Sequence, residues 1–251
     1  MVKTKEDFKT LIYINEDRRL EPDLQYFDRD NAELGERGLL VPVIGTETKS
    51  SFQSLFEHWV GTEELVYAMA DYSEVVEECL AAMYKNALKS VEISVQSGAE
   101  AFISWEDSST TNISPQLFEK YIAPEITQWN RAIHSVGKHY LLHACGYIAA
   151  LVPIMKNMGI DMIESASPPP TGNIEPWEVS EMLPDHIGVI GGIKPTIFQN
   201  CASTELEEYV ENLIFRMKGN KFILANYNNC PPGVQPEKFR LVSEIVRRRI
   251  N

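Results

Sequence analysis

Short apolar runs alternate with amphipathic helical stretches along most of this chain, and this alternation constrains its fold more than any other feature. The six runs predicted as strands are residues 38–45, 101–104, 139–143, 161–164, 187–190 and 222–225. Strands that are separated by helices need crossover connections, and they form a parallel sheet with helices packed on it. The sequence therefore predicts an α/β fold.

Capping residues predict where several of the helices begin. Asp71 with Glu74 and Thr204 with Glu207 have capping-box spacing, and the first of these opens a long predicted helix that ends near Gly98. Ser114 followed by proline predicts a further helix start. Other helices are expected at residues 148–158, 177–183 and 236–250.

Polar residues follow several of the predicted strands, and this placement favours a barrel over a nucleotide-binding sheet. No Gly-x-Gly-x-x-Gly follows the first run and no Walker-type loop occurs. The residues at strand ends are Glu106, Asp107, His143, Cys145, Glu164, Lys194 and Cys230. Active sites of (β/α)8 barrels form at those ends. We predict one barrel-type domain over residues 1–251, with residues 1–37 as an N-terminal extension or plug.

The charge balance and the lack of long apolar windows narrow the range of partners. The formal net charge is −13, which disfavours nucleic acid and anionic membranes because both attract basic surfaces. No window approaches the roughly 18 apolar residues that cross a bilayer. The start of the chain lacks the apolar core of a secretory signal. Four scattered cysteines without a disulfide-like framework indicate a reducing cytoplasm.

One histidine and two cysteines suggest a metal site. His143 and Cys145 are two residues apart at the end of an apolar run, so on a strand their side chains point to the same face. Cys230 follows another such run. An imidazole and two thiolates at adjacent strand ends are typical of catalytic zinc with one open coordination position. The alternative interpretation is a core histidine with two buried free cysteines.

From about residue 37 to its end, the chain resembles the uroporphyrinogen decarboxylase superfamily, and within it the corrinoid-dependent methyltransferases. The motifs that carry the resemblance are Trp105-Glu106-Asp107, residues 113–118 (ISPQLF), His143-Ala144-Cys145-Gly146, Gly191-Gly192-Ile193 and Cys230-Pro231-Pro232-Gly233. The resemblance implies that His143, Cys145 and Cys230 bind catalytic zinc, and Gly191 and Gly192 are the candidate cofactor-binding positions.

The resemblance also implies methyl transfer to or from the cobalt of a corrinoid protein, with the cobamide supplied by that separate partner. We favour a small O-methyl donor, such as a methoxylated aromatic, whose methyl group passes to cobalt(I). The alternatives are transfer from methyl-cobalt to a thiol of the coenzyme M type, and a non-catalytic truncated relative. Tetrapyrrole decarboxylation is disfavoured, because the family's substrate-binding arginines lie in an N-terminal portion that this chain lacks.

Three carboxylates are the candidate catalytic residues. Glu164 follows the strand after the His143 strand, so it either reaches the fourth metal position or lies outside the metal's coordination shell. Glu106 and Asp107 follow another strand. One of them would donate a proton to a leaving oxygen, orient a ligand histidine, or cap the loop.

Six strands, where the family has eight, predict an incomplete barrel with exposed sheet edges. Exposed edges leave unpaired backbone groups and apolar surface in water. We therefore expect a homodimer that covers the opening through the helix at residues 71–97 and the segment 52–59. The alternative is that residues 5–15 fold back as a helix and plug the gap.

Overall fold

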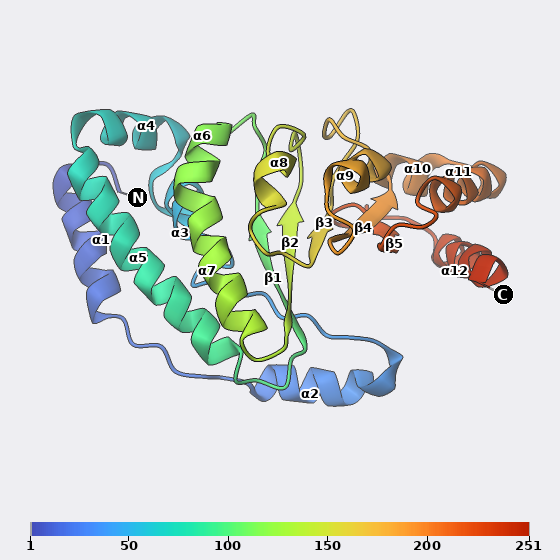
Figure 1. Cartoon of the computed structure of the whole chain (residues 1–251), viewed down its shortest axis with the longest axis horizontal. Helices are drawn as coiled ribbons and strands as arrows, with labels where there is room; N and C mark the ends of the chain where they lie inside the picture. Colours follow the sequence, from blue (N-terminus) through green and yellow to red (C-terminus); the bar gives the residue numbers. More distant parts are fainter. Residues whose placement is uncertain (1, 251) are drawn as a thin grey trace.

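The fold is built on five parallel strands in an open sheet (Figure 1). The computed structural model describes residues 2–250, so Met1 and Asn251, the two ends of the predicted domain, lie outside the described residues. The strands are β1 (Ala101–Glu106), β2 (His139–Ala144), β3 (Met162–Glu164), β4 (Gly188–Ile193) and β5 (Phe222–Asn226). Their order in the sheet follows the sequence, β1-β2-β3-β4-β5. The predicted α/β class is confirmed.

At least one helix follows each strand. These helices are α6 (Pro115–Leu117), the π-helical turn η3 (Phe118–Ile122), α7 (Ala123–His134), α8 (Val152–Met155), α9 (Pro176–Met182), α10 (Pro195–Asn200), α11 (Ser203–Arg216) and α12 (Pro236–Ile250). The predicted start at Ser114 is confirmed, because its hydroxyl accepts a hydrogen bond from the backbone N–H of Leu117 at 3.2 Å. α7 packs on β2 and α9 packs on β4.

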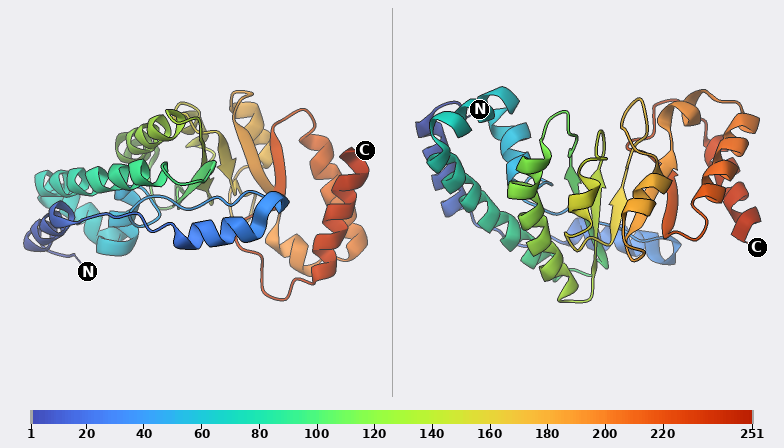
Figure 2. Two further views of the ribbon diagram at one scale, coloured as in Figure 1. Left: turned by 90° about the horizontal axis from the view of Figure 1, so that it is seen from below. Right: turned by 45° about the horizontal axis from the view of Figure 1, so that its top comes forward.

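The first hundred residues are mostly helical. They form α1 (Lys5–Asp17), α2 (Gln25–Leu34), the 3-10 turn η1 (Gly35–Arg37), α3 (Ser51–Ser54), the π-helical turn η2 (Leu55–Val60), α4 (Thr62–Asp71) and α5 (Ser73–Ser94). α1 packs against α5. α2 has no buried residue and lies on the side of the sheet away from α7, as Figure 2 (left) shows. The predicted helix at residues 5–15 is therefore present, packed on another helix.

The first predicted strand, at residues 38–45, is wrong. Its remnant is one parallel bridge between Val43 and Ile103 on β1. The Ile44 N–H donates to the carbonyl of Ile103 at 2.8 Å, and the Ile103 N–H donates to the carbonyl of Pro42 at 3.1 Å. Pro42 has no N–H to extend this ladder. The sheet accordingly has five strands in the described part of the chain, not six.

Three helix boundaries also differ from the prediction. Asp71 is the last residue of α4, and Tyr72, at φ −151°, precedes α5 without a side-chain cap. The start of α11 is stabilised by Glu205, which accepts from the Ala202 N–H at 2.9 Å, and not by the predicted pair two residues later. The helix predicted at residues 148–158 shrinks to α8, which begins beside Pro153, a residue suited to a first helical turn.

Two hydrophobic clusters form the interior. The large one spans the N-terminal helices and β1 to β4, and the small one consists of Ile193, Phe198, Leu206, Val210 and Ile245. The apolar residues expected at a dimer interface, including Phe52, Leu55 and Met83, lie inside the large cluster. Among the described residues, no helix is long and apolar enough to cross a membrane.

Candidate functional site

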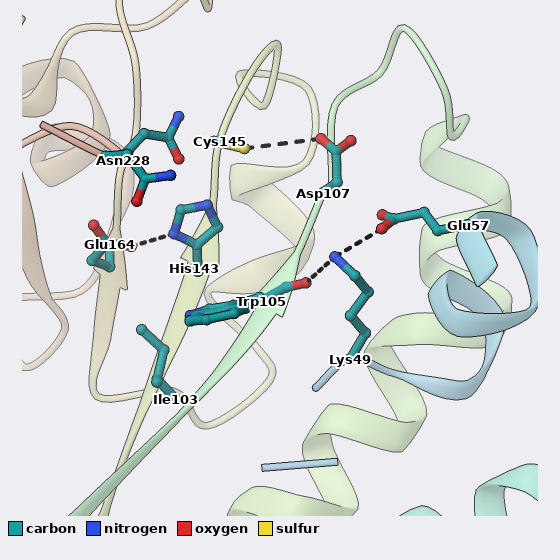
Figure 3. Close-up of a pocket in the computed structure, with 10 residues that line it drawn as sticks. Lys49, Glu57, Ile103, Trp105, Asp107, His143, Cys145, Glu164 and Asn228 are labelled. Carbon is teal, nitrogen blue, oxygen red and sulfur yellow. Dashed lines mark hydrogen bonds and ion pairs between the residues drawn. The ribbon is translucent and has the colours of Figure 1, made fainter. Parts of the chain in front are cut away.

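A cavity of about 520 Å³ opens at the carboxyl ends of β1, β2 and β3 (Figure 3). Four residues predicted from the sequence line it, namely Asp107, His143, Cys145 and Glu164. The parallel register explains their convergence, since His143 pairs with Trp105 on one side and with Glu164 on the other. Strand ends that lie in register bring distant sequence positions together at one edge of the sheet.

A carboxylate holds the imidazole of His143 in place. The Nδ1 atom of His143 is hydrogen-bonded to Oε2 of Glu164, and the Ser165 hydroxyl donates to Oε1 of the same carboxylate. The His143 side chain is 15% exposed. With Nδ1 bonded to Glu164, Nε2 is the ring nitrogen that a metal ion would use. A second ring nitrogen free for a metal, with the first bonded to a carboxylate, is the usual arrangement of metal-binding histidines.

The electrostatics around His143 favour a positive charge at this position. Burial opposes protonation, but hydrogen bonding to Cys145 and Glu164 outweighs it and raises the pKa of His143 to about 9. This shift favours the positively charged imidazole, with a proton on both ring nitrogens, when no metal is bound. A metal ion would take the place of the proton on Nε2.

Asp107 and Glu106 are neighbours in sequence but occupy different environments. Asp107 lines the cavity, and the Cys145 thiol donates to its Oδ1 at 3.9 Å. Glu106 is fully buried, and burial raises its pKa. It accepts hydrogen bonds from the backbone N–H and hydroxyl of Ser50, at 2.7 and 2.8 Å. In the structure Glu106 therefore anchors the loop before α3 and does not line the cavity.

Two charged residues that sequence reasoning missed also reach the cavity, Lys49 from that loop and Glu57 from η2. The ammonium of Lys49 donates to the carbonyl of Trp105 at 2.9 Å and pairs with Glu57 at 2.8 Å. Lys49, Glu57 and Trp105 all line the cavity. No local pattern marks Lys49 or Glu57, because they reach the cavity through contacts between positions far apart in the sequence.

Cys230 is not assembled with the other two predicted metal ligands. It is exposed, and its nearest polar contact is the carbonyl of Pro231 at 3.8 Å. Asn228 and Asn229, just before it, do line the cavity. Within residues 2–250, no group of three histidine, cysteine or acidic side chains is arranged to hold a metal ion. The structure thus brings together His143 and Cys145, with Cys230 on the adjoining loop.

Gly191 and Gly192 permit close packing next to β5. A Cβ atom on Gly192 would lie 2.4 Å from Leu213, and one on Gly191 would lie 2.9 Å from the ring of Tyr227. The carbonyl of Gly192 accepts a hydrogen bond from Tyr209 at 2.6 Å. These contacts account for both glycines through packing, and their role toward a cofactor stays a prediction.

Comparison with known proteins places the fold in a family. The model of the uroporphyrinogen decarboxylase (URO-D) family matches residues 2–249, so the chain belongs to that family. The expected superfamily is confirmed, whereas membership of the corrinoid-dependent branch stays a prediction. No curated protein sequence is detectably similar to the chain.

Three solved structures share the fold at low sequence identity. A methyltransferase from Methanosarcina mazei has a TM-score of 0.69 at 12% identity, over 88% of this chain and 62% of that one. A protein described as a vitamin-B12-independent methionine synthase from Listeria monocytogenes has a TM-score of 0.58 at 14% identity, over 94% of this chain and 71% of that one. A B12-independent methionine synthase from a Shewanella species has a TM-score of 0.52 at 15% identity, over 93% of this chain and 69% of that one. The chain therefore spans about 62% of the length of the methyltransferase that it resembles.

Proposed function

We propose that this chain is a zinc-dependent methyltransferase that moves a methyl group from a small O-methyl donor to the cobalt(I) of a corrinoid protein. The observation that carries the proposal is the pairing of His143 and Cys145 in one cavity, with a carboxylate on the far nitrogen of the imidazole. Membership of the URO-D family and a fold shared with methyltransferases support it.

The donor atoms suit zinc in kind. Imidazole nitrogen and thiolate sulfur are the ligands that zinc prefers in proteins. His143 and Cys145 would provide two of them, and Cys230 would provide the third if the loop after Asn229 turns inward. Glu164 would keep the imidazole oriented. A zinc ion bound in this cavity would act as a Lewis acid. It would either weaken the methyl–oxygen bond of a donor or lower the pKa of a bound thiol.

The chain's own residues then position the donor and handle its proton. Asp107 lies beside Cys145 and is the candidate group for passing a proton to the leaving oxygen. Lys49, fixed by Glu57 and by the Trp105 carbonyl, sets one wall of the cavity. Held in place, such groups lower the barrier by orienting the reactants.

The corrinoid would arrive on a separate protein at the open mouth of the cavity. We also assign the chain to the cytoplasm, a compartment that keeps free thiols such as its four cysteines reduced. Assays with cob(I)alamin plus methyl donors, run beside assays with methylcobalamin plus thiols, distinguish donor cleavage from the reverse transfer to a thiol. Turnover in neither direction would indicate a non-catalytic relative.

Metal analysis of purified variants tests the ligand set. We expect about one zinc per chain in the wild type and its loss in Cys145→Ala and in Cys230→Ala, together with methyl transfer. Cys201→Ala is the matched control, because Cys201 lies outside the cavity lining. Stoichiometric zinc in Cys230→Ala would show that the third ligand is a different residue.

A further inference from the structure

We propose that Trp105 is the platform on which the aromatic ring of the methyl donor stacks, and that the cavity selects rings without an anionic group. This inference rests on the proposed function and names its substrate class. The two observations behind it are an uncovered indole in the cavity and an excess of carboxylates around it.

The indole of Trp105 is exposed although its backbone is firmly held. Trp105 as a residue is 49% exposed, whereas Ser104 and Glu106 on either side are fully buried. The Trp105 N–H donates to the carbonyl of Thr48 at 2.8 Å, and its own carbonyl accepts from Lys49 at 2.9 Å. Because the backbone is fixed on both sides, the ring is presented to the cavity at a defined place.

The position of the ring suits a stacked ligand next to the candidate metal ligands. Figure 3 shows the indole edge-on between Ile103 and His143, so that one of its faces is turned toward the level of His143. Trp105 and His143 are register partners on neighbouring strands. A ring lying on the indole would place a methoxy substituent beside His143 and Cys145.

A second tryptophan shows what a covered indole looks like in this chain. The Arg216 guanidinium stacks over Trp177, 4.6 Å from the ring centroid, in a different cavity between α9 and α11. In the described part of the chain, no aromatic ring or cation covers Trp105 in the same way. Trp105 therefore keeps a free face that offset stacking with another aromatic ring can use.

The charges around the indole disfavour an anionic donor. Three carboxylates line the cavity, those of Glu57, Asp107 and Glu164. The ammonium of Lys49 is paired with Glu57 at 2.8 Å, and the imidazole of His143 is paired with Glu164. Asp107 has only the Cys145 thiol, a weak donor, at 3.9 Å. A zinc ion bound by the thiolates of Cys145 and Cys230 would not change this balance, because their two negative charges offset its two positive charges. A carboxylate on the donor would therefore meet Asp107 without a net positive charge to offset the repulsion.

Binding of matched ligands to the full-length chain, without a corrinoid protein, tests the inference. The probes are three methoxy-substituted rings, a neutral benzyl alcohol, a benzylammonium and a benzoate, with methoxycyclohexane as the non-aromatic comparison. Dissociation constants are measured by calorimetry for the wild type, Trp105→Leu and Asp107→Asn. Trp177→Leu is the matched control, because it removes an indole from the other cavity. Circular dichroism of each variant confirms that it is folded.

We expect the benzyl alcohol and the benzylammonium to bind the wild type, and the benzoate to bind roughly tenfold more weakly. Trp105→Leu should weaken ring binding roughly three- to tenfold, with a smaller change for methoxycyclohexane. Trp177→Leu should leave all the dissociation constants unchanged. Asp107→Asn should reduce the difference in dissociation constant between the benzoate and the benzyl alcohol.

The inference is overturned if no ring binds the wild type, if Trp105→Leu binds rings as tightly as the wild type, or if the benzoate binds as tightly as the alcohol. Ring binding that depends on Trp105, in a protein with no zinc and no methyl transfer, would retain this inference and reject the proposed function. Methyl transfer that is unaffected by Trp105→Leu would retain the proposed function and reject this inference.

Discussion

The two edges of the sheet, the β1 side and the β5 side, are packed to different degrees. Next to β1 and β2, the large cluster buries Phe102, Trp129 and Tyr140 completely. At the other side, β5 is only partly buried, Ile223 on it is 52% exposed, and the small cluster under α10 to α12 has few members. Figure 2 (right) shows β5 and α12 at the end of the molecule opposite α1 and α5.

This difference divides the candidate metal site. His143 lies near the end of β2 and Cys145 directly follows that strand, on the well-packed side, where the surrounding side chains hold them in place. Cys230 follows β5 on the thinly packed side and is exposed. Regions with few buried apolar contacts open at lower free-energy cost than the core. We infer that two ligands are preorganised, and that the third would join them only if the loop after β5 turns inward on metal binding.

Matched truncations on the two sides test the packing difference directly and should have the largest effect. Ile126→Ala in the large cluster and Ile245→Ala in the small cluster remove the same atoms from residues with no exposed surface. Isoleucine-to-alanine changes cost about 2–5 kcal/mol, depending on how far the site relaxes. We expect Ile126→Ala near the upper limit and Ile245→Ala near the lower one.

Urea denaturation followed by circular dichroism gives both free energies of unfolding. Equal losses for the two variants, or a larger loss for Ile245→Ala, would contradict the contrast between the two sides.

The well-packed side also contains a buried carboxylate, whose protonation should make stability depend on pH. Glu125 is 2% exposed and accepts two hydrogen bonds from Ser51, both at 2.9 Å. Burial, opposed by the Ser51 hydrogen bonds and assisted by the nearby Glu106 and Glu47, raises the pKa of Glu125 to about 8. The folded state therefore prefers the protonated carboxyl.

The direction of the pH effect follows from that shift. A carboxyl with a raised pKa contributes its full stabilisation below the unfolded pKa of about 4.3, and the contribution is lost as pH rises toward 8. Relative to Glu125→Gln, the wild type should lose on the order of a few kcal/mol of stability between pH 4.3 and 8. Thermal unfolding across this range measures the difference, with the exposed Glu119→Gln as control. A difference that does not change with pH would mean that Glu125 stays ionised in the fold.

The five strands of the sheet were predicted correctly from the sequence, whereas the point at which the sheet begins was not. The apolar runs at β1 to β4 stand out because strands of a parallel sheet are largely buried on both faces. The run at β5 is equally apolar, although β5 is only partly buried. Residues 38–45 are equally apolar, but Pro42 and the neighbouring irregular chain leave them one bridge. The helix starts at Asp71 and Thr204 failed because acidic and hydroxyl residues are frequent there, so that local capping patterns match at more than one register.

The candidate site was predictable to the extent that it lies at strand ends. Asp107, His143, Cys145 and Glu164 line one cavity because carboxyl ends of neighbouring parallel strands converge. Lys49 reaches the same cavity from the loop before α3, and Glu57 reaches it from η2. The Ser50 contact with Glu106 that places Lys49 joins residues 56 positions apart. Contacts at that separation leave no periodic signal in one sequence.

The thinly packed side also tests the predicted homodimer, with a small effect on stability and a clear effect on mass. In the described residues β5 has one strand partner, β4, and Ile223 is 52% exposed. An exposed sheet edge with apolar side chains is a surface that a second chain can cover. Because the other apolar faces proposed for an interface are inside the large cluster, we expect any dimer to form at the β5 side.

Ile223→Lys should then convert the dimer to a monomer at micromolar concentration, as measured by analytical ultracentrifugation. A surface change of this kind alters monomer stability by about 0.5 kcal/mol or less. Phe215→Lys, at an exposed position on α11, is the matched control and should leave the mass unchanged. A wild type that is monomeric at all concentrations would reject the dimer, and a dimer that persists in Ile223→Lys would place the interface elsewhere.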